Sequence, residues 1–274
     1  MRSPFGRPIG AATLLVAFTL LSAACGDSKP AAIEALGEPG AAPTNYRVQI
    51  LAEYPHDDEA FTQGLVWAGN GDLYESTGQK GQSSLRRVRI DTGEVLEQHD
   101  LDDSYFGEGL ALVGDDLIQL TWQEETAFVY EQETFDVTNT LDYDGEGWGL
   151  CFDGRRLVMS DGSSTLTFRD PTTFDSVGRI RVTDNGTPLS SLNELECVGD
   201  RVYANVLGDD DIYEIDPATG AVTATIDASA LRPDNARAGL DVLNGIAYAE
   251  DAGHFYLTGK NWPTLYEVTF EPMG

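Results

Sequence analysis

Glu108-Gly109-Leu110-Ala111-Leu112 is the stretch that decides the fold, because its pattern recurs along the chain. Each copy has a polar or aromatic residue, then Gly or Glu, then Leu or Ile, and an apolar residue two places later. The copies start 40 to 51 residues apart, which indicates a repeat architecture. The other four copies are Gln63-Gly64-Leu65-Val66-Trp67, Trp148-Gly149-Leu150-Cys151-Phe152, Asn193-Glu194-Leu195-Glu196-Cys197 and Asn244-Gly245-Ile246-Ala247-Tyr248.

Each copy begins a series of short strands. A turn rich in Gly and Asp follows the copy, a second and a third strand come next, and turns such as Asp91-Thr92-Gly93 lead to a fourth. Four strands in a period of this length are typical of a propeller blade. The sequence therefore predicts an all-β fold, a five-bladed β-propeller. The second strands are expected at 73–78, 117–122, 157–162, 202–207 and 255–260.

The last repeat needs a strand from elsewhere in the chain. It stops after its third strand, near Phe270, whereas the alternating segment Tyr46-Arg47-Val48-Gln49-Ile50-Leu51 has no repeat of its own. We expect this segment to complete the last blade, because that pairing closes the ring and removes an exposed sheet edge. The propeller domain is therefore expected to span 45–274.

The first 44 residues have the features of a targeting segment. Arg2 and Arg7 precede an apolar run that ends at Cys25, and small residues stand just before this cysteine. This pattern indicates a lipoprotein-type signal peptide at 1–24 with lipidation of Cys25, or a plain secretory peptide cut nearby. Residues 25–44 are expected to form a flexible tether. We expect an exported, lipid-anchored protein at the periplasmic or extracellular face of the cell envelope.

Composition excludes several classes of function. The chain has 274 residues, 41% of them hydrophobic, so it can bury a large core. Its 17 Lys and Arg face 46 Asp and Glu, and the net charge of −29 argues against binding nucleic acid or anionic lipid headgroups. Three His and three Cys leave little material for a zinc centre, and we expect no metal or cofactor.

Two cysteines stand in neighbouring repeats. Cys151 lies three residues after the first residue of its copy and Cys197 lies four after. Side chains alternate along a strand, so the two thiols are expected on opposite faces of their strands and not to form a disulfide.

The first residues of the five copies should surround one end of the central channel, because the first strand of each blade lines it. They are unlike one another and mostly polar: Gln63, Glu108, Trp148, Asn193 and Asn244. Trp122 and Lys260 end second strands at the same rim. Five unlike groups converging on one spot favour a site, although a polar channel lining would also be solvated in a protein without one.

Several of these segments together resemble the plant and bacterial type of glutaminyl cyclase. The resemblance covers about 45–270, in order. It implies a five-bladed propeller that converts the N-terminal glutamine of peptides into pyroglutamate with release of ammonia, without the catalytic zinc of the animal-type enzymes. The resembling segments include Phe61-Thr62-Gln63-Gly64-Leu65, Ser104-Tyr105-Phe106-Gly107-Glu108-Gly109-Leu110, Gly147-Trp148-Gly149-Leu150 and Thr258-Gly259-Lys260-Asn261-Trp262-Pro263.

The resemblance also implies roles for single residues. Glu108 would transfer the proton, and Asn193 and Lys260 would line the substrate pocket, where the chemistry of the reaction lets them stabilise charge on oxygen. Phe61, Gln63, Trp122 and Trp148 would bind the substrate. Leu207 stands where this family commonly has Trp, so part of the aromatic wall is expected to differ.

Two other functions fit parts of the pattern. A non-catalytic propeller that binds a cell-envelope partner would explain Leu207. A calcium-dependent propeller hydrolase would use Glu108, Asn193 and Asn244 as ligands. The expected partners are peptides or proteins with N-terminal Gln, and the expected state is a monomer.

Overall fold

The computed structural model describes residues 34–36, 42–237 and 239–274. All described residues belong to the second of the chain's two units, Ala32–Gly274. The expected signal peptide at 1–24 and the expected lipidation site Cys25 lie outside the described residues. Within the described part, no helix has the length and apolar character that a membrane crossing requires.

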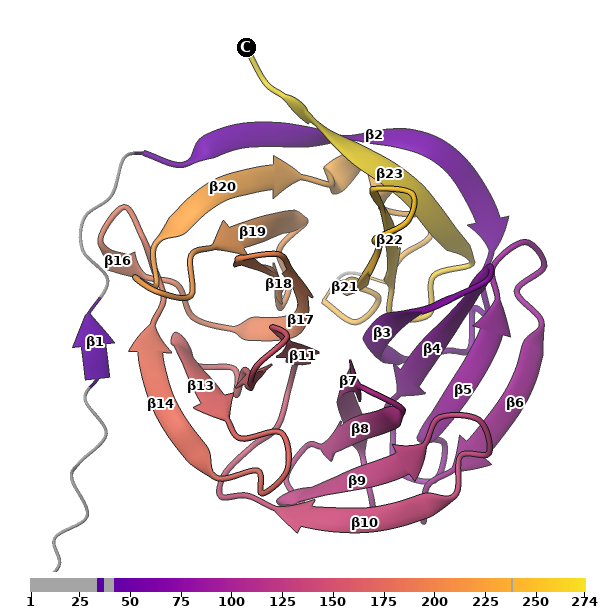
Figure 1. The fold of residues 1–274 in the computed structure, drawn as a ribbon. Coiled ribbons are helices and arrows are strands. Elements are labelled where there is room, and N and C mark those ends of the chain that lie inside the picture. Colours follow the sequence, from indigo (N-terminus) through magenta and orange to yellow (C-terminus); the bar gives the residue numbers. More distant parts are fainter. Residues whose placement is uncertain (1–33, 37–41, 238) are drawn as a thin grey trace, which may run out of the picture. The chain divides into compact units, whose positions relative to one another are not determined.

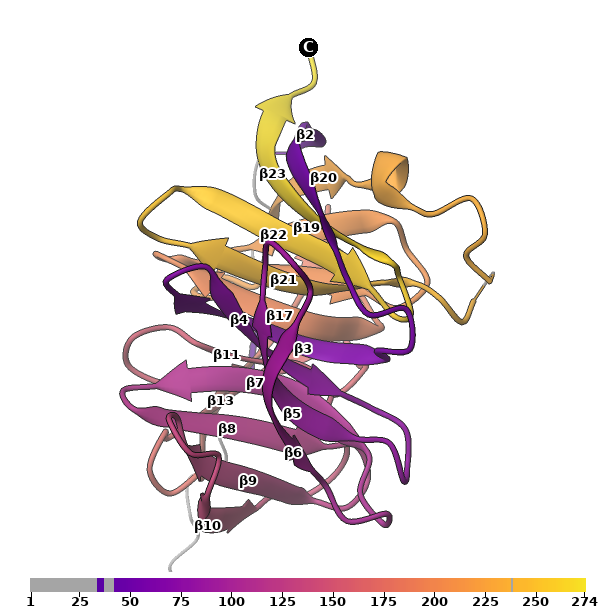
Figure 2. The same ribbon diagram turned by 90° about the vertical axis from the view of Figure 1, so that its right-hand side faces the viewer.

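The second unit is built from small antiparallel sheets, and the predicted all-β class is confirmed. Figure 1 shows these sheets grouped around a centre, and Figure 2 shows them from the side, with their connecting turns at the two ends of the strands. Two sheets have four strands each: β3 (Thr62–Gly69), β4 (Asp72–Thr77), β5 (Ser84–Arg89) and β6 (Val95–Asp100), then β7 (Gly107–Val113), β8 (Asp116–Thr121), β9 (Thr126–Glu131) and β10 (Val137–Asp142).

The third sheet gains an extra strand at its outer edge. It consists of β11 (Leu150–Phe152), β12 (Leu157–Met159), β13 (Thr165–Arg169) and β14 (Ser176–Arg181). A short strand from the segment expected to be a tether, β1 (Glu34–Leu36), pairs with β14 in parallel. The small hairpin of β15 (Thr183–Asp184) and β16 (Thr187–Pro188) follows.

The longest sheet joins the two ends of the described chain. Its first strands are β17 (Leu192–Val198), β18 (Arg201–Val206), β19 (Asp211–Ile215) and β20 (Val222–Asp227), with the 3-10 helix η1 (Ser229–Leu231) after them. Its other strands are β21 (Leu243–Ala249), β22 (His254–Gly259), β23 (Thr264–Pro272) and β2 (Thr44–Pro55). β2 is antiparallel to β23 from Tyr46 to Pro55, and it is parallel to β20 from Thr44 to Arg47.

The core lies between neighbouring sheets. Tyr74 and Leu85 of one sheet pack with Leu110 and Leu117 of the next in a buried cluster. The same arrangement recurs between later sheets, where Leu120 joins a cluster with residues of β11 and β12. Alternate side chains of each strand therefore face one neighbouring sheet or the other, which is why the strands are apolar on both faces near the centre.

The repeated glycine has a packing reason. A side chain at Gly64 would place its Cβ 2.6 Å from the backbone nitrogen of Leu110, and one at Gly109 would place it 2.5 Å from that of Leu150. The inner strands of neighbouring sheets approach this closely only because no Cβ separates them.

The one copy without glycine has Glu194 instead. This side chain is fully buried, and its carboxylate accepts hydrogen bonds from the backbone N–H of Leu65 (3.4 Å) and of Ile246 (2.9 Å). Burial raises the pKa of Glu194 well above its usual range, with the nearby carboxyl of Glu196 adding to the shift. Glu194 therefore links β17 to the inner strands β3 and β21.

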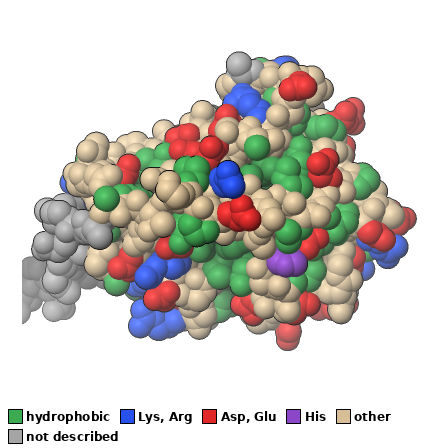
Figure 3. Space-filling view, turned by 90° about the horizontal axis from the view of Figure 1, so that it is seen from above, with side chains coloured by type: hydrophobic (Ala, Val, Ile, Leu, Met, Phe, Trp, Pro, Cys, Tyr) green, Lys and Arg blue, Asp and Glu red, His purple; other side chains and the backbone are tan. Residues whose placement is uncertain are grey.

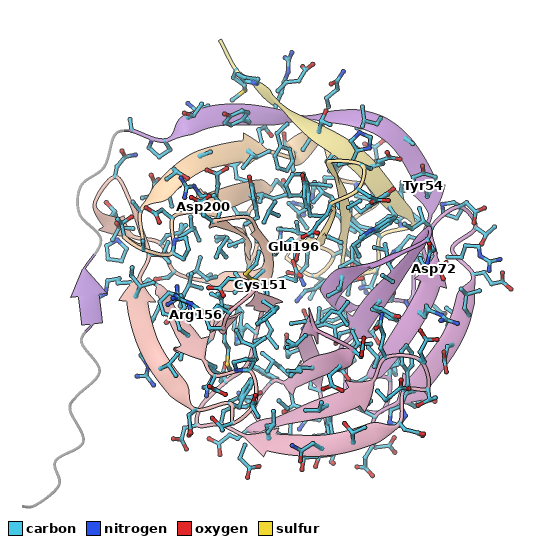
Figure 4. The ribbon with its side chains drawn as sticks, viewed as in Figure 1. Tyr54, Asp72, Cys151, Arg156, Glu196 and Asp200 are labelled. Atoms are coloured by element: carbon cyan, nitrogen blue, oxygen red, sulfur yellow. A yellow bond between two sulfur atoms is a disulfide. The ribbon has the colours of Figure 1, made fainter. Side chains whose placement is uncertain are left out.

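Cys151 and Cys197 form a disulfide with their Cα atoms 5.4 Å apart, so the prediction that they do not pair is wrong. Neighbouring sheets pack face to face, and Cys151 belongs to the same buried cluster as Leu195 and Val202 of the following sheet. One face of a sheet packs against the opposite face of the next sheet. Two cysteines that point from opposite faces of their own sheets therefore point toward each other, so the alternation of side chains favours this disulfide and does not exclude it. Figure 4 shows Cys151 near the centre of the group of sheets, close to Glu196.

Candidate active site

A pocket of about 290 Å³ lies at the end of the inner strands where each strand begins. It brings together all seven residues that the sequence proposed for catalysis or substrate binding: Phe61, Gln63, Glu108, Trp122, Trp148, Asn193 and Lys260. Phe106, Leu207, Gly239 and Leu240 complete its lining. Asn244 does not line the pocket, although it occupies the equivalent place in the fifth copy.

Irregularities in the strand pairing hold the polar residues at this rim. The register between first and second strands shifts between Thr62 and Gly64, and again between Gly107 and Leu110. Gln63 and Glu108 lie within these shifts, and Asn193 lies within a corresponding shift in β17. A β-bulge re-aims the side chains of its residues, so the bulges explain why polar groups near the start of an inner strand can turn away from the sheet packing.

Only one oxygen of the Glu108 carboxyl group has a hydrogen-bond partner among the described residues. The Glu108 side chain is 4% exposed, and its Oε1 accepts a hydrogen bond of 2.9 Å from Nε2 of Gln63. Asn244 supports this arrangement from behind, because its Nδ2 donates to Oε1 of Gln63 (3.3 Å) and to the carbonyl of Thr62 (2.9 Å). Oε2 of Glu108 is buried and has no hydrogen-bond partner among the described residues. The carboxyl group is therefore oriented with one oxygen left for a ligand.

Burial shifts the pKa of Glu108 and that of Lys260 in the directions that favour their uncharged forms. Burial raises the pKa of Glu108 well above its usual range, the Lys260 charge opposes the rise, and the carboxylates of Glu146 and Glu124 add to it. Burial lowers the pKa of Lys260 to about 8, against the attraction of Glu108. The ammonium nitrogen lies 4.7 Å from the ring centre of Phe61, a cation–π contact. Lys260 can therefore exchange a proton near neutral pH, and burial favours the protonated form of Glu108.

Asn193 offers a second donor to the pocket. The residue is 1% exposed, and its Nδ2 has no hydrogen-bond partner in the part of the chain that the structure describes. Its backbone carbonyl accepts a hydrogen bond of 2.6 Å from Oγ of Ser160, which ties β17 to the neighbouring sheet. A buried amide donor without a partner is costly in a folded protein, so it marks a place where a ligand oxygen fits.

Aromatic rings form the rest of the wall. Phe106 meets both Phe61 and Trp122 edge to face, with ring centres 6.1 and 5.7 Å apart. The indole N–H groups of Trp122 and Trp148 both donate to Oε2 of Glu146, at 2.9 and 3.0 Å. A Cβ at Gly162 would lie 2.7 Å from the Trp148 ring, so the absence of a side chain there makes room for the indole.

A buried ionic cluster stands behind the segment that carries Phe61 and Gln63. Glu75 accepts hydrogen bonds from Arg86 (2.6 Å), His56 (3.1 Å) and Thr62 (2.7 Å). Burial opposes ionisation of Glu75, but the positive charges of Arg86 and His56 outweigh it and hold the pKa of Glu75 well below its usual range. His56 also bonds to the carbonyl of Trp262 (2.7 Å), so this cluster connects the chain before β3 to the turn after β22.

Sequence reasoning missed three contributors to this site. Phe106 stands two residues before Glu108 in a quoted segment, and this position could have indicated it. Glu146 stands at the corresponding place, two residues before Trp148, whereas Leu240 carries no comparable signal because it comes from a segment distant from the repeated stretches. Across the described residues, no group of three or more His, Cys, Asp or Glu side chains converges in a way that could hold a metal ion.

The arrangement supports a definite kind of chemistry. One buried carboxyl group can take and return a proton, an amide and an ammonium group can donate to an oxygen that gains negative charge, and apolar rings can exclude water. The surface around the sheets is different in character: Figure 3 shows acidic side chains at several separate places, with hydrophobic and basic ones between them.

Three comparisons place the chain among known proteins. A family model described as glutamine cyclotransferase matches residues 15–270. The glutaminyl-peptide cyclotransferase of Arabidopsis thaliana is 42% identical over 225 residues, which cover 81% of this chain and 70% of that protein. The crystal structure of Myxococcus xanthus glutaminyl cyclase is similar with a TM-score of 0.78 and 40% identity, over 85% of this chain and all of that one.

Proposed function

The chain belongs to the glutamine cyclotransferase family and is a glutaminyl-peptide cyclotransferase, and on that premise we propose that Glu108 is the residue that transfers the proton in its reaction. The observation that carries this proposal is the state of the Glu108 carboxyl group. It is buried, oriented by Gln63 through one oxygen and unpartnered at the other among the described residues. The substrate is a peptide or protein that begins with glutamine.

The first step forms the ring. The α-amine nitrogen of the substrate attacks the carbon of its own γ-carboxamide, so a C–N bond forms and the carbonyl oxygen takes the negative charge. The amine must be neutral, and its ordinary pKa of about 7.7–8.0 makes this form available near neutral pH. The proton that the attacking nitrogen loses goes to Oε2 of the Glu108 carboxylate.

The second step releases ammonia. The bond between the carboxamide carbon (Cδ) and the amide nitrogen breaks, the carbonyl reforms, and Glu108 gives its proton to the departing nitrogen. The products are the lactam of pyroglutamate and ammonia, and Glu108 returns to the carboxylate. The raised pKa of Glu108 supports the first step, because burial makes its carboxylate a stronger base than a solvated carboxylate.

The remaining residues act on charge and position. Nδ2 of Asn193 and the ammonium group of Lys260 donate to the oxyanion, which is the largest effect available to such a site. Trp122, Trp148 and Phe61 pack the folded glutamine side chain and bring its amine near the carboxamide carbon.

We extend the proposal to the architecture and the location of the protein. The strand pairings support five blades, with β2 as the fourth strand of the last blade and hence a closed ring. Deletion of β2 should then abolish folding of the domain, whereas an open arrangement of sheets would tolerate it. The N-terminal sequence supports export and lipid attachment at Cys25, and Cys25→Ser should then release the protein from membranes into the soluble fraction.

Release of ammonia from a short Gln-initiated peptide by the purified protein tests the function. The same peptide beginning with Glu is the matched control, because it lacks the leaving nitrogen. We expect ammonia with the first peptide only, and an unchanged rate after treatment with a calcium chelator. No ammonia would favour a binding propeller, and loss of activity with chelator would favour a calcium-dependent hydrolase.

A further inference from the structure

Glu146 connects the two indoles of the pocket wall through a single oxygen. Trp122 follows β8 and Trp148 precedes β11, which are strands of different sheets, yet the Nε1 of each indole donates to Oε2 of Glu146. The other oxygen, Oε1, accepts a hydrogen bond of 2.8 Å from Nε2 of Gln123. Glu146 does not itself line the pocket.

The backbone explains how one carboxylate reaches both rings. Glu146 precedes Trp148 by two residues, and the intervening Gly147 donates its N–H to the carbonyl of Trp122 at 2.9 Å. A Cβ at Gly147 would lie 2.8 Å from the carbonyl of Thr121, so glycine allows the two chain segments to approach. The carboxylate is thereby adjacent to Trp148 in sequence and to Trp122 in space.

Each indole also packs against a neighbour of its own. Trp122 contacts Phe106 edge to face, and Trp148 packs on Gly162. A planar ring held at one face or edge can still turn about its side-chain torsions, and a hydrogen bond at the far end of the indole removes that freedom. Because one oxygen receives both N–H groups, the two rings are fixed relative to each other as well as to the backbone.

We propose that Glu146 is a positioning residue that sets the orientation of both indoles and thereby shapes the pocket for the folded glutamine side chain. This inference rests on the proposed function. Glu146 suits the role because it is ionised: hydrogen bonds from Gln123, Trp148 and Trp122 lower its pKa, although partial burial opposes them. A hydrogen bond to an ionised acceptor is roughly twice as strong as one between neutral groups.

The test compares Glu146→Gln with Glu133→Gln, which removes the same charge from an exposed turn of a neighbouring segment. An amide has one acceptor oxygen and cannot supply the charge, so Glu146→Gln should raise KM for a Gln-initiated peptide by about tenfold, the effect of one weakened charge-assisted hydrogen bond. Glu133→Gln should stay within about twofold of the wild type. Acrylamide quenching of tryptophan fluorescence should increase in Glu146→Gln alone, and this readout does not depend on activity.

A double-mutant comparison separates positioning from general damage to the fold. Trp122→Phe with Trp148→Phe removes both N–H donors and keeps aromatic rings in the wall. In that background Glu146→Gln should change KM by less than about twofold, because its partners are already gone. An equal effect in both backgrounds, or a wild-type KM for Glu146→Gln, would overturn the proposal. A wild-type protein that releases no ammonia would instead refute the function, while the fluorescence result would still report on the indoles.

Discussion

Replacing Glu108 by glutamine tests the reasoning most directly, because this change removes proton transfer and little else. The amide is nearly the same size, and its oxygen can still accept the hydrogen bond that Gln63 donates at 2.9 Å. The buried position of Glu108 stays filled, so no cavity forms. The fold and the binding of substrate should therefore be preserved while the reaction slows.

The size of the effect follows from the role. A positioned general acid–base group contributes roughly 10²–10⁴ in rate, which corresponds to about 2.7–5.4 kcal/mol of transition-state stabilisation. We expect kcat for ammonia release to fall by that factor, with KM within about threefold of the wild type. Lys260 should also respond, because loss of the Glu108 charge removes an attraction that raises the pKa of the lysine.

The pH dependence of the free energy of unfolding gives an independent test of the raised pKa of Glu108. The pKa of Glu108 is raised in the folded protein, so its contribution to stability is complete below the unfolded pKa and is lost as the pH rises through the folded pKa. A glutamine at this position has no such loss. The variant should therefore be at least as resistant to denaturant as the wild type at pH 7, and the gap should shrink toward pH 4.

The assay is continuous measurement of ammonia from a short Gln-initiated peptide, with denaturant unfolding followed by fluorescence in parallel. A kcat within tenfold of the wild type would refute the proton-transfer role. A variant that loses activity together with several kcal/mol of stability would show that Glu108 acts as a structural residue instead.

Further substitutions test other residues of the site and the structure that supports it. Lys260 acts as an ammonium group and burial lowers its pKa to about 8, so kcat should fall as the pH rises above that value, and Lys260→Gln should abolish this alkaline limb of the pH profile. Leu207→Trp adds apolar surface at the pocket mouth and should lower KM for a Gln-peptide by roughly threefold to tenfold, as steady-state kinetics will measure. Cys151→Ser combined with Cys197→Ser should lower the free energy of unfolding by about 2–4 kcal/mol, and the same loss should appear when the wild type is measured with reductant. Glu75→Gln leaves the buried Arg86 with only its partly exposed partner Asp57 and should cost about 3 kcal/mol in denaturant unfolding, whereas an unchanged midpoint would mean that the cluster is not ionised.

Much of the fold was predictable because its causes are local. Alternating apolar residues favour strands, and the spacing of Gly64, Gly109 and Gly149 follows from contacts that each inner strand makes with the next one. The segment Tyr46–Leu51 was predicted to pair with the last repeat because that repeat lacked a strand, and the observed pairing with β23 extends further, to Pro55. The location of the site followed from the same repeat, since equivalent positions in equivalent strands come to the same rim.

Most residues that line the site were predictable from the sequence, whereas the hydrogen bonds between them were not. Glu108, Asn193 and Lys260 were expected at one rim and line one pocket. The sequence also placed Asn244 at this rim, but its amide lies behind Gln63 and orients that side chain instead. Equivalent sequence positions share a place on the backbone, whereas the direction of each side chain depends on which neighbour fills the space.

The sequence by itself determined most of the strands and seven of the residues that line the pocket, because strand alternation and close backbone approach are properties of short segments that repeat. Only the tertiary structure decided which groups meet across sheets. The Cys151–Cys197 bridge and the sharing of Glu146 by two indoles depend on distances between separate segments. The raised pKa of Glu108 depends in the same way on how completely the assembled sheets exclude water, which no local pattern encodes.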